Sequence, residues 1–309
     1  MDRFLQDRKV FLFPGVGVKY KKFLRLFNEE QLKKLKRYTE IINSELNIDL
    51  WSYANSELDS ETNNEFLEWI LIYACDCIVY RTYIKKGIKP DVFVGYSMGV
   101  ITAMVCAEAL SFEAGLNLLN NIYLYPTKAK RKEEAMATII GLDYNDVRKI
   151  IEEVNLEEYV EIASENSDYC IVISGIKNAV CKIMEIAEEQ GAIKTIKLNS
   201  TYAFHSSYAL GGIESMYNFI KGMEINQAKI PIMSIFTQKL IIEKKDLKRE
   251  LLINVSSSMK WKDTILKLGE IGKNKFVEVS LNDALTKISR VINLEYEFST
   301  YQEIVEFNI

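Results

Sequence analysis

The sequence predicts an α/β fold in which a small ferredoxin-like subdomain is inserted into a larger core. Two observations predict it: the first 125 residues alternate short apolar runs with helical patterns, and a βαββαβ order follows between residues 133 and 199. The chain has 309 residues, of which 48% are hydrophobic, so it is long enough to bury a sizeable core.

The first part begins with an apolar run that stops at a turn-forming Pro-Gly pair, which indicates a buried strand entering a tight loop. Helices are predicted where amphipathic periodicity follows an Asn or Ser that can cap a helix. The predicted elements are a strand over 9–13, a helix from Asn28 to about Leu46, a helix from Glu61 to Lys86, a strand over 90–94, an apolar helix to Leu110, and a helix from Ser111 that ends before Pro126.

A charged linker over 128–134 separates this part from the next. The expected order is then strand 136–142, helix 145–154, strands 159–164 and 169–174, helix 178–190 and strand 193–198. The predicted boundaries are therefore 1–132 and 200–309 for the core and 133–199 for the small subdomain. A helix after Ser206 and strands near 230–236 and 275–279 are expected to complete the core.

Composition excludes several classes of function. The chain has 43 acidic and 39 basic residues and no basic block, so we expect no nucleic-acid partner. No apolar run is long enough for a membrane span, and the first residues lack the apolar core of a signal peptide, so a cytoplasmic location is expected. A single histidine and the Cys75-x-Cys77 spacing argue against a metal site, and we expect no cofactor.

Ser97 is the first candidate for chemistry, because it lies in a G-x-S-x-G motif between a predicted strand and a helix of small residues. In this context the sharp turn pushes the serine hydroxyl out of the sheet, and glycines at 95 and 99 avoid collisions across the turn. The helix N-terminus that follows favours an oxyanion. The alternative is a serine that only caps a buried helix.

A serine nucleophile needs a base, and His205 is the only histidine in the chain. It is expected to open a helix after a strand. The alternative is a histidine packed beside Phe204 with no catalytic role. The loop over 13–17 is not a dinucleotide-binding fingerprint, but a tight loop at a strand end can present a backbone N–H towards Ser97.

Taken together, these motifs resemble a known family, that of the malonyl-CoA:acyl carrier protein transacylases and the stand-alone acyltransferases of polyketide synthases. The resemblance covers about the whole chain and rests on segments in family order: FPGVG (13–17), GYSMG (95–99), AMATIIGL (135–142), AFHS (203–206), MKW (259–261) and FVEV (276–279). It implies an α/β-hydrolase-like core, an acyl-serine intermediate in a ping-pong mechanism, and acyl-CoA and acyl carrier protein as partners.

The resemblance also assigns roles to individual residues. Ser97 is the expected nucleophile and His205 the expected base. The backbone N–H groups of Val16 and Met98 would form the oxyanion hole, and the main-chain carbonyl of Asn254 would orient the histidine. The residues expected to line the acyl pocket are Ile122, Tyr96, Phe204 and Tyr202.

The departures from the family pattern bear on the substrate. Val16, Tyr96 and Val100 replace a glutamine, a histidine and a glutamate, and Ser280-Leu281-Asn282 replaces a Gly-Pro-Gly. Malonyl-specific members carry a carboxylate-binding arginine where this chain has Ile122. An isoleucine would leave a malonyl carboxylate unpaired, so a neutral acyl group is expected and Ile122→Arg is expected to favour malonyl. The alternative is a cation from elsewhere, such as Arg131.

The expected function is therefore acyl transfer between thioesters, in polyketide or fatty-acid biosynthesis. The alternatives are hydrolysis of acyl groups from carrier proteins, malonyl-CoA:acyl carrier protein transacylase activity, and a non-catalytic carrier-binding protein. A lipase-like esterase would need an aspartate in its triad and is disfavoured. A carrier protein would dock on a basic surface, for which the candidates are Lys128, Lys130, Arg131 and Lys132, although such a run can be solvated surface only. A monomer is expected.

Overall fold

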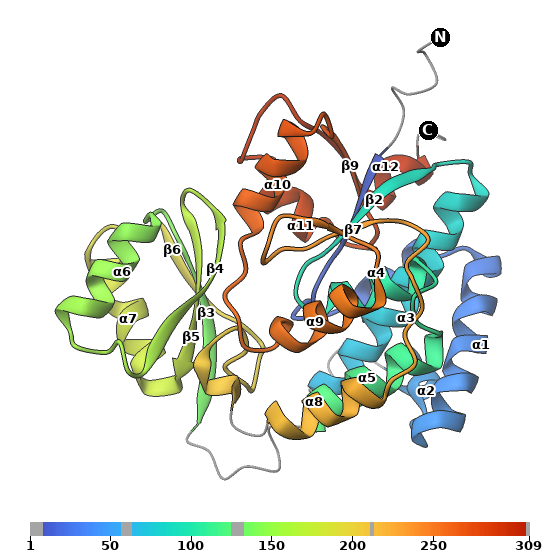
Figure 1. The fold of residues 1–309 in the computed structure, drawn as a ribbon, viewed down its shortest axis with the longest axis horizontal. Coiled ribbons are helices and arrows are strands. Elements are labelled where there is room, and N and C mark those ends of the chain that lie inside the picture. Colours follow the sequence, from blue (N-terminus) through green and yellow to red (C-terminus); the bar gives the residue numbers. More distant parts are fainter. Residues whose placement is uncertain (1–8, 57–63, 125–132, 211–212, 307–309) are drawn as a thin grey trace.

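Two β-sheets form the framework of the protein (Figure 1). The computed structural model describes residues 9–56, 64–124, 133–210 and 213–306. A six-stranded sheet has the order β10-β9-β1-β2-β7-β8, and a four-stranded sheet has the order β4-β5-β3-β6. The predicted α/β fold with a small antiparallel subdomain is confirmed, whereas the exact boundaries of the two parts stay a prediction.

The six-stranded sheet is parallel except at one edge, where β7 and β8 pair antiparallel. Its strands are β1 (Lys9–Phe13), β2 (Pro90–Gly95), β7 (Ile232–Met233), β8 (Leu240–Ile241), β9 (Lys275–Glu278) and β10 (Glu297–Ser299). Alternation along β1 fixes its two faces: Phe11 and Phe13 pack in one apolar cluster, Val10 and Leu12 in another. Both faces are covered, as a parallel sheet requires.

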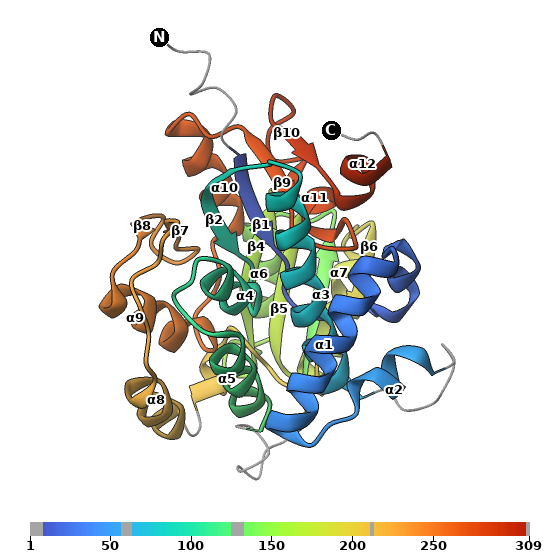
Figure 2. The same cartoon turned by 90° about the vertical axis from the view of Figure 1, so that its right-hand side faces the viewer.

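Helices cover the two faces of this sheet (Figure 2). Helices α1, α3, α4 and α5 belong to the cluster around Phe11, and α10 and α11 belong to the cluster around Val10. The helices of the core are α1 (Glu29–Leu46), α2 (Leu50–Asn55), α3 (Glu65–Lys85), α4 (Gly99–Cys106), α5 (Phe112–Leu124), α8 (Ile213–Gly222), α9 (Lys244–Asn254), α10 (Trp261–Glu270), α11 (Ala284–Ser289) and α12 (Tyr301–Glu306), with 3-10 turns η1 (Lys21–Leu26) and η3 (Ser207–Leu210).

The four-stranded sheet is antiparallel and contains the predicted βαββαβ order. Its elements are β3 (Glu134–Ile140), α6 (Tyr144–Glu153), β4 (Val160–Ser167), β5 (Cys170–Ile176), α7 (Lys177–Glu189) and β6 (Lys194–Lys197). Alternation along β3 again separates two faces. Ala135, Ala137 and Ile139 pack with α6 and α7, whereas Met136 and Thr138 line a cavity shared with the core.

Several predicted elements differ from the structure. The helix after the G-x-S-x-G motif ends at Cys106 rather than Leu110, because Glu108 adopts a left-handed backbone (φ 58°). The strand expected over 230–236 has only two residues, Ile232–Met233. The long helix is described from Glu65, and its predicted start at Glu61 lies outside the described residues. The helices α9 to α12 were not predicted.

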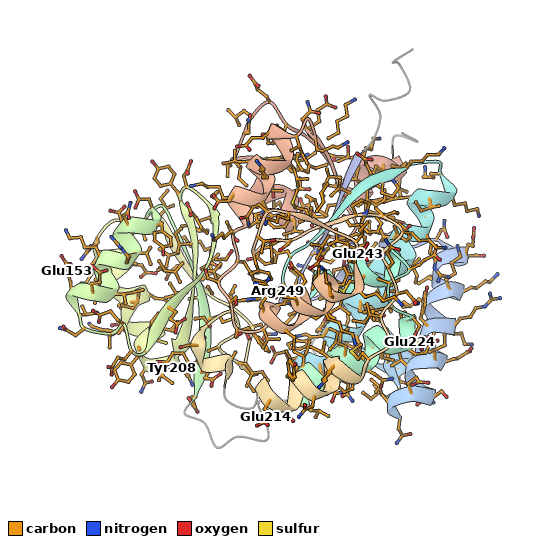
Figure 3. All side chains as sticks on the ribbon, viewed as in Figure 1. Glu153, Tyr208, Glu214, Glu224, Glu243 and Arg249 are labelled. Atoms are coloured by element: carbon orange, nitrogen blue, oxygen red, sulfur yellow. The ribbon has the colours of Figure 1, made fainter. Side chains whose placement is uncertain are left out.

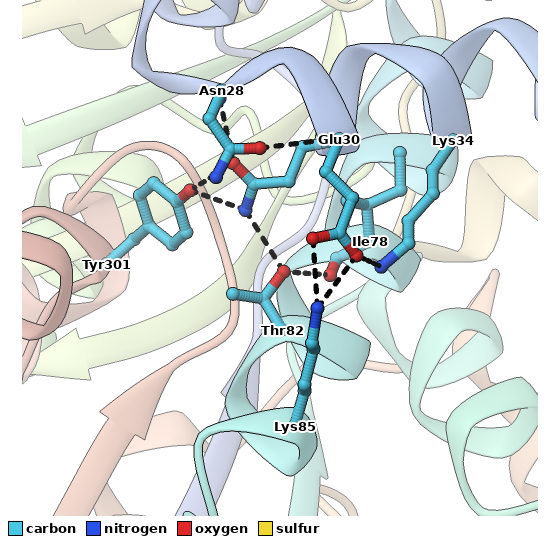
Figure 4. A network of polar contacts seen from close by, with 8 residues as sticks. Asn28, Glu30, Lys34, Ile78, Thr82, Lys85 and Tyr301 are labelled. Atoms are coloured by element: carbon cyan, nitrogen blue, oxygen red, sulfur yellow. Dashed lines mark hydrogen bonds and ion pairs between the residues drawn. The ribbon is translucent and has the colours of Figure 1, made fainter.

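Polar contacts join the first helix to distant parts of the core (Figure 4). The side-chain amide of Gln31 in α1 donates to the hydroxyl groups of Thr82 in α3 and of Tyr301 in α12. Glu30 forms ion pairs with Lys34 and Lys85 on the exposed side of this contact. These contacts hold the N-terminal and C-terminal helices against α3.

The small subdomain is bonded to the core at several points. The backbone N–H of Met259 donates to the carbonyl of Ala163 at 2.8 Å, and that of Ala203 donates to the Glu134 carboxylate at 2.8 Å. Tyr208, labelled in Figure 3, donates its hydroxyl hydrogen to the carbonyl of Glu158. These bonds hold the small subdomain in a fixed position against the core. Within the described ranges, no helix is both long and apolar enough to cross a membrane.

Candidate active site

Ser97 lies at the turn between β2 and α4 with a left-handed backbone (φ 53°). A non-glycine residue adopts this conformation only when surrounding contacts impose it. The amide of Tyr96 donates to the carbonyl of Phe13 at 2.9 Å, which ties the turn to the end of β1. The strand-to-helix turn predicted from the sequence is thus present.

The two glycines of the motif are required by close packing. A Cβ at Gly95 would lie 2.2 Å from the backbone N and Cα of Val100. A Cβ at Gly99 would lie 2.1 Å from the carbonyl oxygen of Phe13. Neither position has room for a side chain, so the motif is explained by the close contact of α4 with the ends of β1 and β2.

His205 faces Ser97, with its Nε2 atom 2.8 Å from the serine Oγ. The histidine does not open a helix as predicted. It has a left-handed backbone (φ 59°) in the turn before η3, and its N–H donates to the carbonyl of Val255 at 2.7 Å. This bond to the segment after α9 holds the histidine in a turn, two residues before η3 begins.

Burial keeps the imidazole of His205 neutral. The residue is 2% exposed, and burial lowers its pKa from 6.5 to about 4, against a smaller opposing effect from the backbone of Ser257 and Asn254. Its Nδ1 atom makes no hydrogen bond of ordinary geometry with a described residue, although those two backbone groups lie near. A neutral ring that carries its hydrogen on Nδ1 can accept the proton of Ser97 through Nε2.

Asn254 is the last residue of α9 and contacts both members of this pair. Its Nδ2 atom donates to the backbone carbonyl of Ser97 at 3.2 Å. The sequence predicted a different contact, in which the main-chain carbonyl of Asn254 orients the ring of His205. The backbone of Asn254 is near the ring of His205, as noted above, so the orienting role stays a prediction and the side-chain bond to the serine turn is a further finding.

The backbone N–H groups of Val16 and Met98 were predicted to form an oxyanion hole. Both residues line the same cavity as Ser97. Across the described part of the chain, neither N–H donates to a protein acceptor. Gly15 lies against the turn, since a Cβ there would be 3.0 Å from the carbonyl oxygen of Tyr96. The loop after β1 is therefore close enough to the serine turn for this role.

The serine and the histidine face a cavity of about 240 Å³ between the core and the small subdomain. Its walls come from the loop after β1, the serine turn, strands β3 to β5, the segment before His205, and α11. Most of the lining side chains are apolar, namely Pro14, Val16, Val18, Met98, Met136, Val172, Leu198, Phe204, Met259, Ala284, Leu285 and Ile288.

Two of the four predicted pocket residues line this cavity, and two do not. Tyr96 and Phe204 are in the lining. Ile122 is 2% exposed and packs in the main apolar cluster, because α5 turns this face towards the core. Tyr202 packs its ring against those of Phe204 and Tyr123. Arg131, the proposed substitute cation, lies outside the described residues, as does the basic run Lys128, Lys130, Arg131 and Lys132.

Asn166 is a lining residue that the sequence analysis missed. It lies on β4, is 4% exposed, and its Oδ1 accepts hydrogen bonds from the hydroxyls of Tyr96 at 3.0 Å and of Ser164 at 2.7 Å. Ser164 and Asn166 are polar residues two positions apart, so they share a face of β4, whereas the predicted strand 159–164 ended before Asn166. That pattern was the available signal, but it did not reveal the contact with Tyr96.

No lining residue of the cavity, in the described part of the chain, carries a charge near neutral pH. Its titratable side chains are Tyr96, whose pKa burial raises to about 12, and His205, which is neutral for the reason given above. The arrangement can therefore activate a serine hydroxyl beside an uncharged, largely apolar space. Such a serine can attack an acyl carbon and hold the acyl group as an ester.

Comparison with known proteins identifies the family to which this chain is similar. Residues 76–291 match the family described as "Acyl transferase domain". The malonyl CoA-acyl carrier protein transacylase of Bacillus subtilis (strain 168) is 28% identical over 92% of this chain and 90% of its own length. The polyketide biosynthesis malonyl CoA-acyl carrier protein transacylase of the same organism is 30% identical over 73% of this chain and 78% of its own length.

Solved structures show the same fold. The acyl-carrier-protein S-malonyltransferase of Burkholderia pseudomallei 1710b has a TM-score of 0.87 with 22% sequence identity, covering 97% of this chain and 99% of that one. Because the family match spans well over half of the chain and includes Ser97 and His205, the assignment does not depend on any single motif. This chain belongs to the acyl transferase domain family and is an acyltransferase enzyme of the group that includes the malonyl-CoA:acyl carrier protein transacylases.

Proposed function

We propose that this enzyme transfers a neutral acyl group from a CoA thioester to the phosphopantetheine thiol of an acyl carrier protein, through an acyl ester on Ser97. The observation that carries this proposal is the hydrogen-bonded pair of Ser97 and His205 facing a cavity whose described lining is uncharged. The relatives named above are transacylases of acyl carrier protein, which supports this class of acceptor.

In the first step, His205 Nε2 takes the proton of Ser97 Oγ as the oxygen attacks the thioester carbonyl. The N–H groups of Val16 and Met98 would stabilise the developing oxyanion. The C–S bond then breaks, and the departing thiolate takes the proton from the imidazolium. In the second step the carrier thiol gives its proton to His205 Nε2 and attacks the ester carbonyl. The C–O bond to Ser97 then breaks, and the imidazolium returns the proton to Ser97 Oγ.

The lining residues support a neutral acyl group. A malonyl carboxylate in this cavity would lose its hydration with no cation in the cavity's described lining to replace it, and such a loss costs several kcal/mol. An acetyl or longer chain would instead gain about 0.8 kcal/mol for each buried CH₂. We therefore expect a preference opposite to that in the names of the two Bacillus subtilis relatives.

The test is intact-protein mass spectrometry after brief incubation with acetyl-, butyryl- and malonyl-CoA at equal concentrations. The expected result is a mass increase for the neutral acyl groups at a higher rate than for malonyl, and no increase in Ser97→Ala. Ser111→Ala, which alters a helix cap on α5, serves as the control that should still load. Faster malonyl loading would refute the proposed specificity, and loading of Ser97→Ala would refute the nucleophile.

Adding a phosphopantetheinylated carrier protein to the acylated enzyme separates transfer from hydrolysis. Transfer predicts that the acyl mass moves from the enzyme to the carrier protein. Hydrolysis predicts that the enzyme loses its acyl group at the same rate with or without the carrier, and that free acid accumulates. The second result would favour the alternative of an acyl hydrolase.

A further inference from the structure

A second, smaller cavity lies beside the acyl cavity, and two of its lining residues have polar atoms without a partner. Glu65 is 7% exposed and Trp69 is 1% exposed. Among described residues, neither Oε1 of Glu65 nor Nε1 of Trp69 has a hydrogen-bond partner. The two residues are one helical turn apart in α3 and both line this cavity, so a buried acceptor and a buried donor lie on the same side of the helix.

The other buried carboxylate oxygens that line this cavity are already hydrogen-bonded. Glu65 Oε2 accepts hydrogen bonds from the hydroxyl of Thr201 at 2.6 Å and from its N–H at 3.2 Å. Glu68, which also lines the cavity, accepts from the N–H of Tyr20 at 2.8 Å and from the hydroxyl of Tyr53 at 2.5 Å. Lys19 and Asn199 also line the cavity, but both are exposed to solvent. The buried acceptor and the buried donor without a partner are therefore those of Glu65 and Trp69.

The small cavity adjoins the acyl cavity. Gly17, Val18 and Asn199 line both. The ring of Trp69 also contacts that of Phe204, which lines the acyl cavity, with centroids 5.8 Å apart. The small cavity has a volume of about 10 Å³, which leaves room for a single small polar group.

The chemistry of the two open atoms selects the group that fits. An ammonium group donates only and would leave the indole N–H unpaired, whereas a carbonyl accepts only and would leave an ionised Glu65 unpaired. A hydroxyl group donates to the carboxylate and accepts from the indole. Leaving two such atoms unpaired in a buried position is costly, so a hydroxyl there would be bound with a defined orientation.

We propose that Glu65 and Trp69 form a binding site for one hydroxyl group, supplied by a hydroxylated acyl chain or by a water molecule. The acyl source deepens the function proposed above and rests on it, because it makes hydroxyacyl thioesters the preferred substrates. The water source does not depend on that function.

The first arm of the test measures acyl loading by mass for butyryl-CoA and for butyryl-CoA with a hydroxyl on its second, third or fourth carbon. If the acyl chain supplies the hydroxyl, one hydroxylated isomer should load roughly two- to tenfold faster than butyryl-CoA. Trp69→Phe removes the donor and should bring this ratio to about one. Trp51→Phe, in α2 and outside both cavities, is the matched control that should keep the ratio.

The second arm is a high-resolution crystal structure of the wild-type enzyme without substrate. If water supplies the hydroxyl, an ordered oxygen should lie within hydrogen-bond distance of both Glu65 Oε1 and Trp69 Nε1, with no hydroxyl preference in loading. Should Trp69→Phe fail to fold, Glu65→Gln replaces the open acceptor by a donor and should abolish the preference in the same way.

The proposal is overturned if no hydroxylated isomer is preferred and no oxygen atom bridges the two side chains in the crystal. A different result is that the wild type and Trp69→Phe show the same preference for a hydroxylated isomer over butyryl-CoA. That result would show that the acyl hydroxyl does not bind at Trp69, and it would overturn the acyl source. Failure of the proposed function would look different: no thioester would acylate Ser97, while the crystal structure would still decide whether the site binds a hydroxyl.

Discussion

Asn254 donates a side-chain hydrogen bond to the backbone carbonyl of Ser97, 157 residues earlier in the chain, at 3.2 Å. The next residue, Val255, accepts the backbone N–H of His205 at 2.7 Å. The C-terminal end of α9 therefore holds both members of the serine–histidine pair. Both of these members have left-handed backbones (φ 53° and 59°), a conformation that costs about 1–3 kcal/mol and persists only when other contacts impose it.

Asn254→Ala should slow the acylation of Ser97 and should lower the free energy of unfolding only modestly. The carbonyl of Ser97 keeps its bond from the N–H of Val100, so the stability lost should be about 1–3 kcal/mol, while the serine turn loses one fixed contact. Loading rates by mass and urea unfolding would measure the two effects. The control is Asn117→Ala, which removes an exposed bond to Glu45. Unchanged loading by Asn254→Ala would show that the turn does not need this contact.

Gly99→Ala should destabilise the protein and abolish loading, because its Cβ would lie 2.1 Å from the carbonyl oxygen of Phe13. We expect the free energy of unfolding to fall by at least about 1–3 kcal/mol, because the backbone of α4 or β1 must move to accommodate the Cβ. Gly222→Ala is a matched control: it ends α8, and a Cβ there meets nothing within 4 Å. Chemical denaturation of both variants checks this. Equal stability of the two would contradict the close packing of α4 on β1.

The serine turn could be predicted from the sequence because its cause is local. A strand, two glycines around Ser97 and a run of small residues specify a turn that a side chain at either glycine would block. The βαββαβ order was predictable for the same reason, since alternation in each strand and periodicity in each helix are local patterns.

Other features depend on contacts between distant segments and could not be predicted in this way. The bond between Tyr96 and Asn166 joins residues 70 positions apart, across the groove between the two parts. Ile122 was expected in the pocket because of its position after Ser97, but which face of α5 points to the cavity is decided by how the helix packs on the core. The histidine turn likewise depends on Val255, fifty residues later in the chain.

The pH dependence of acylation should follow His205. Because the neutral ring is the base and its pKa is about 4, the rate kcat/KM should be flat above about pH 5 and fall by half near pH 4. Stopped-flow or quenched mass measurements from pH 3.5 to 8 would test this. A midpoint near 6.5 would mean that the ring is not desolvated in the working enzyme.

The same shift predicts a change in stability with pH. The folded pKa is below the unfolded value of about 6.5, so the unfolded chain binds the extra proton between about pH 4 and 6.5, and the free energy of unfolding should rise with pH across this window. Burial raises the pKa values of Glu250 and Glu278 from 4.5 to about 7. These two groups therefore make the free energy of unfolding fall as the pH rises through that window. Comparing wild type with His205→Gln by urea unfolding at several pH values isolates the histidine; parallel curves would contradict the prediction.

Ile122→Arg should destabilise the enzyme and should not convert it to a malonyl transferase. The isoleucine is 2% exposed within the main apolar cluster, so the guanidinium would be buried without a partner from the cavity lining. An unpaired buried charge costs about 3–5 kcal/mol, whereas the control Ile122→Met conserves volume and should cost less than about 1.5 kcal/mol. Urea unfolding and the ratio of malonyl to acetyl loading measure both consequences. A stable Ile122→Arg enzyme that loads malonyl faster than acetyl would place residue 122 at the acyl group and restore the expectation drawn from the family pattern.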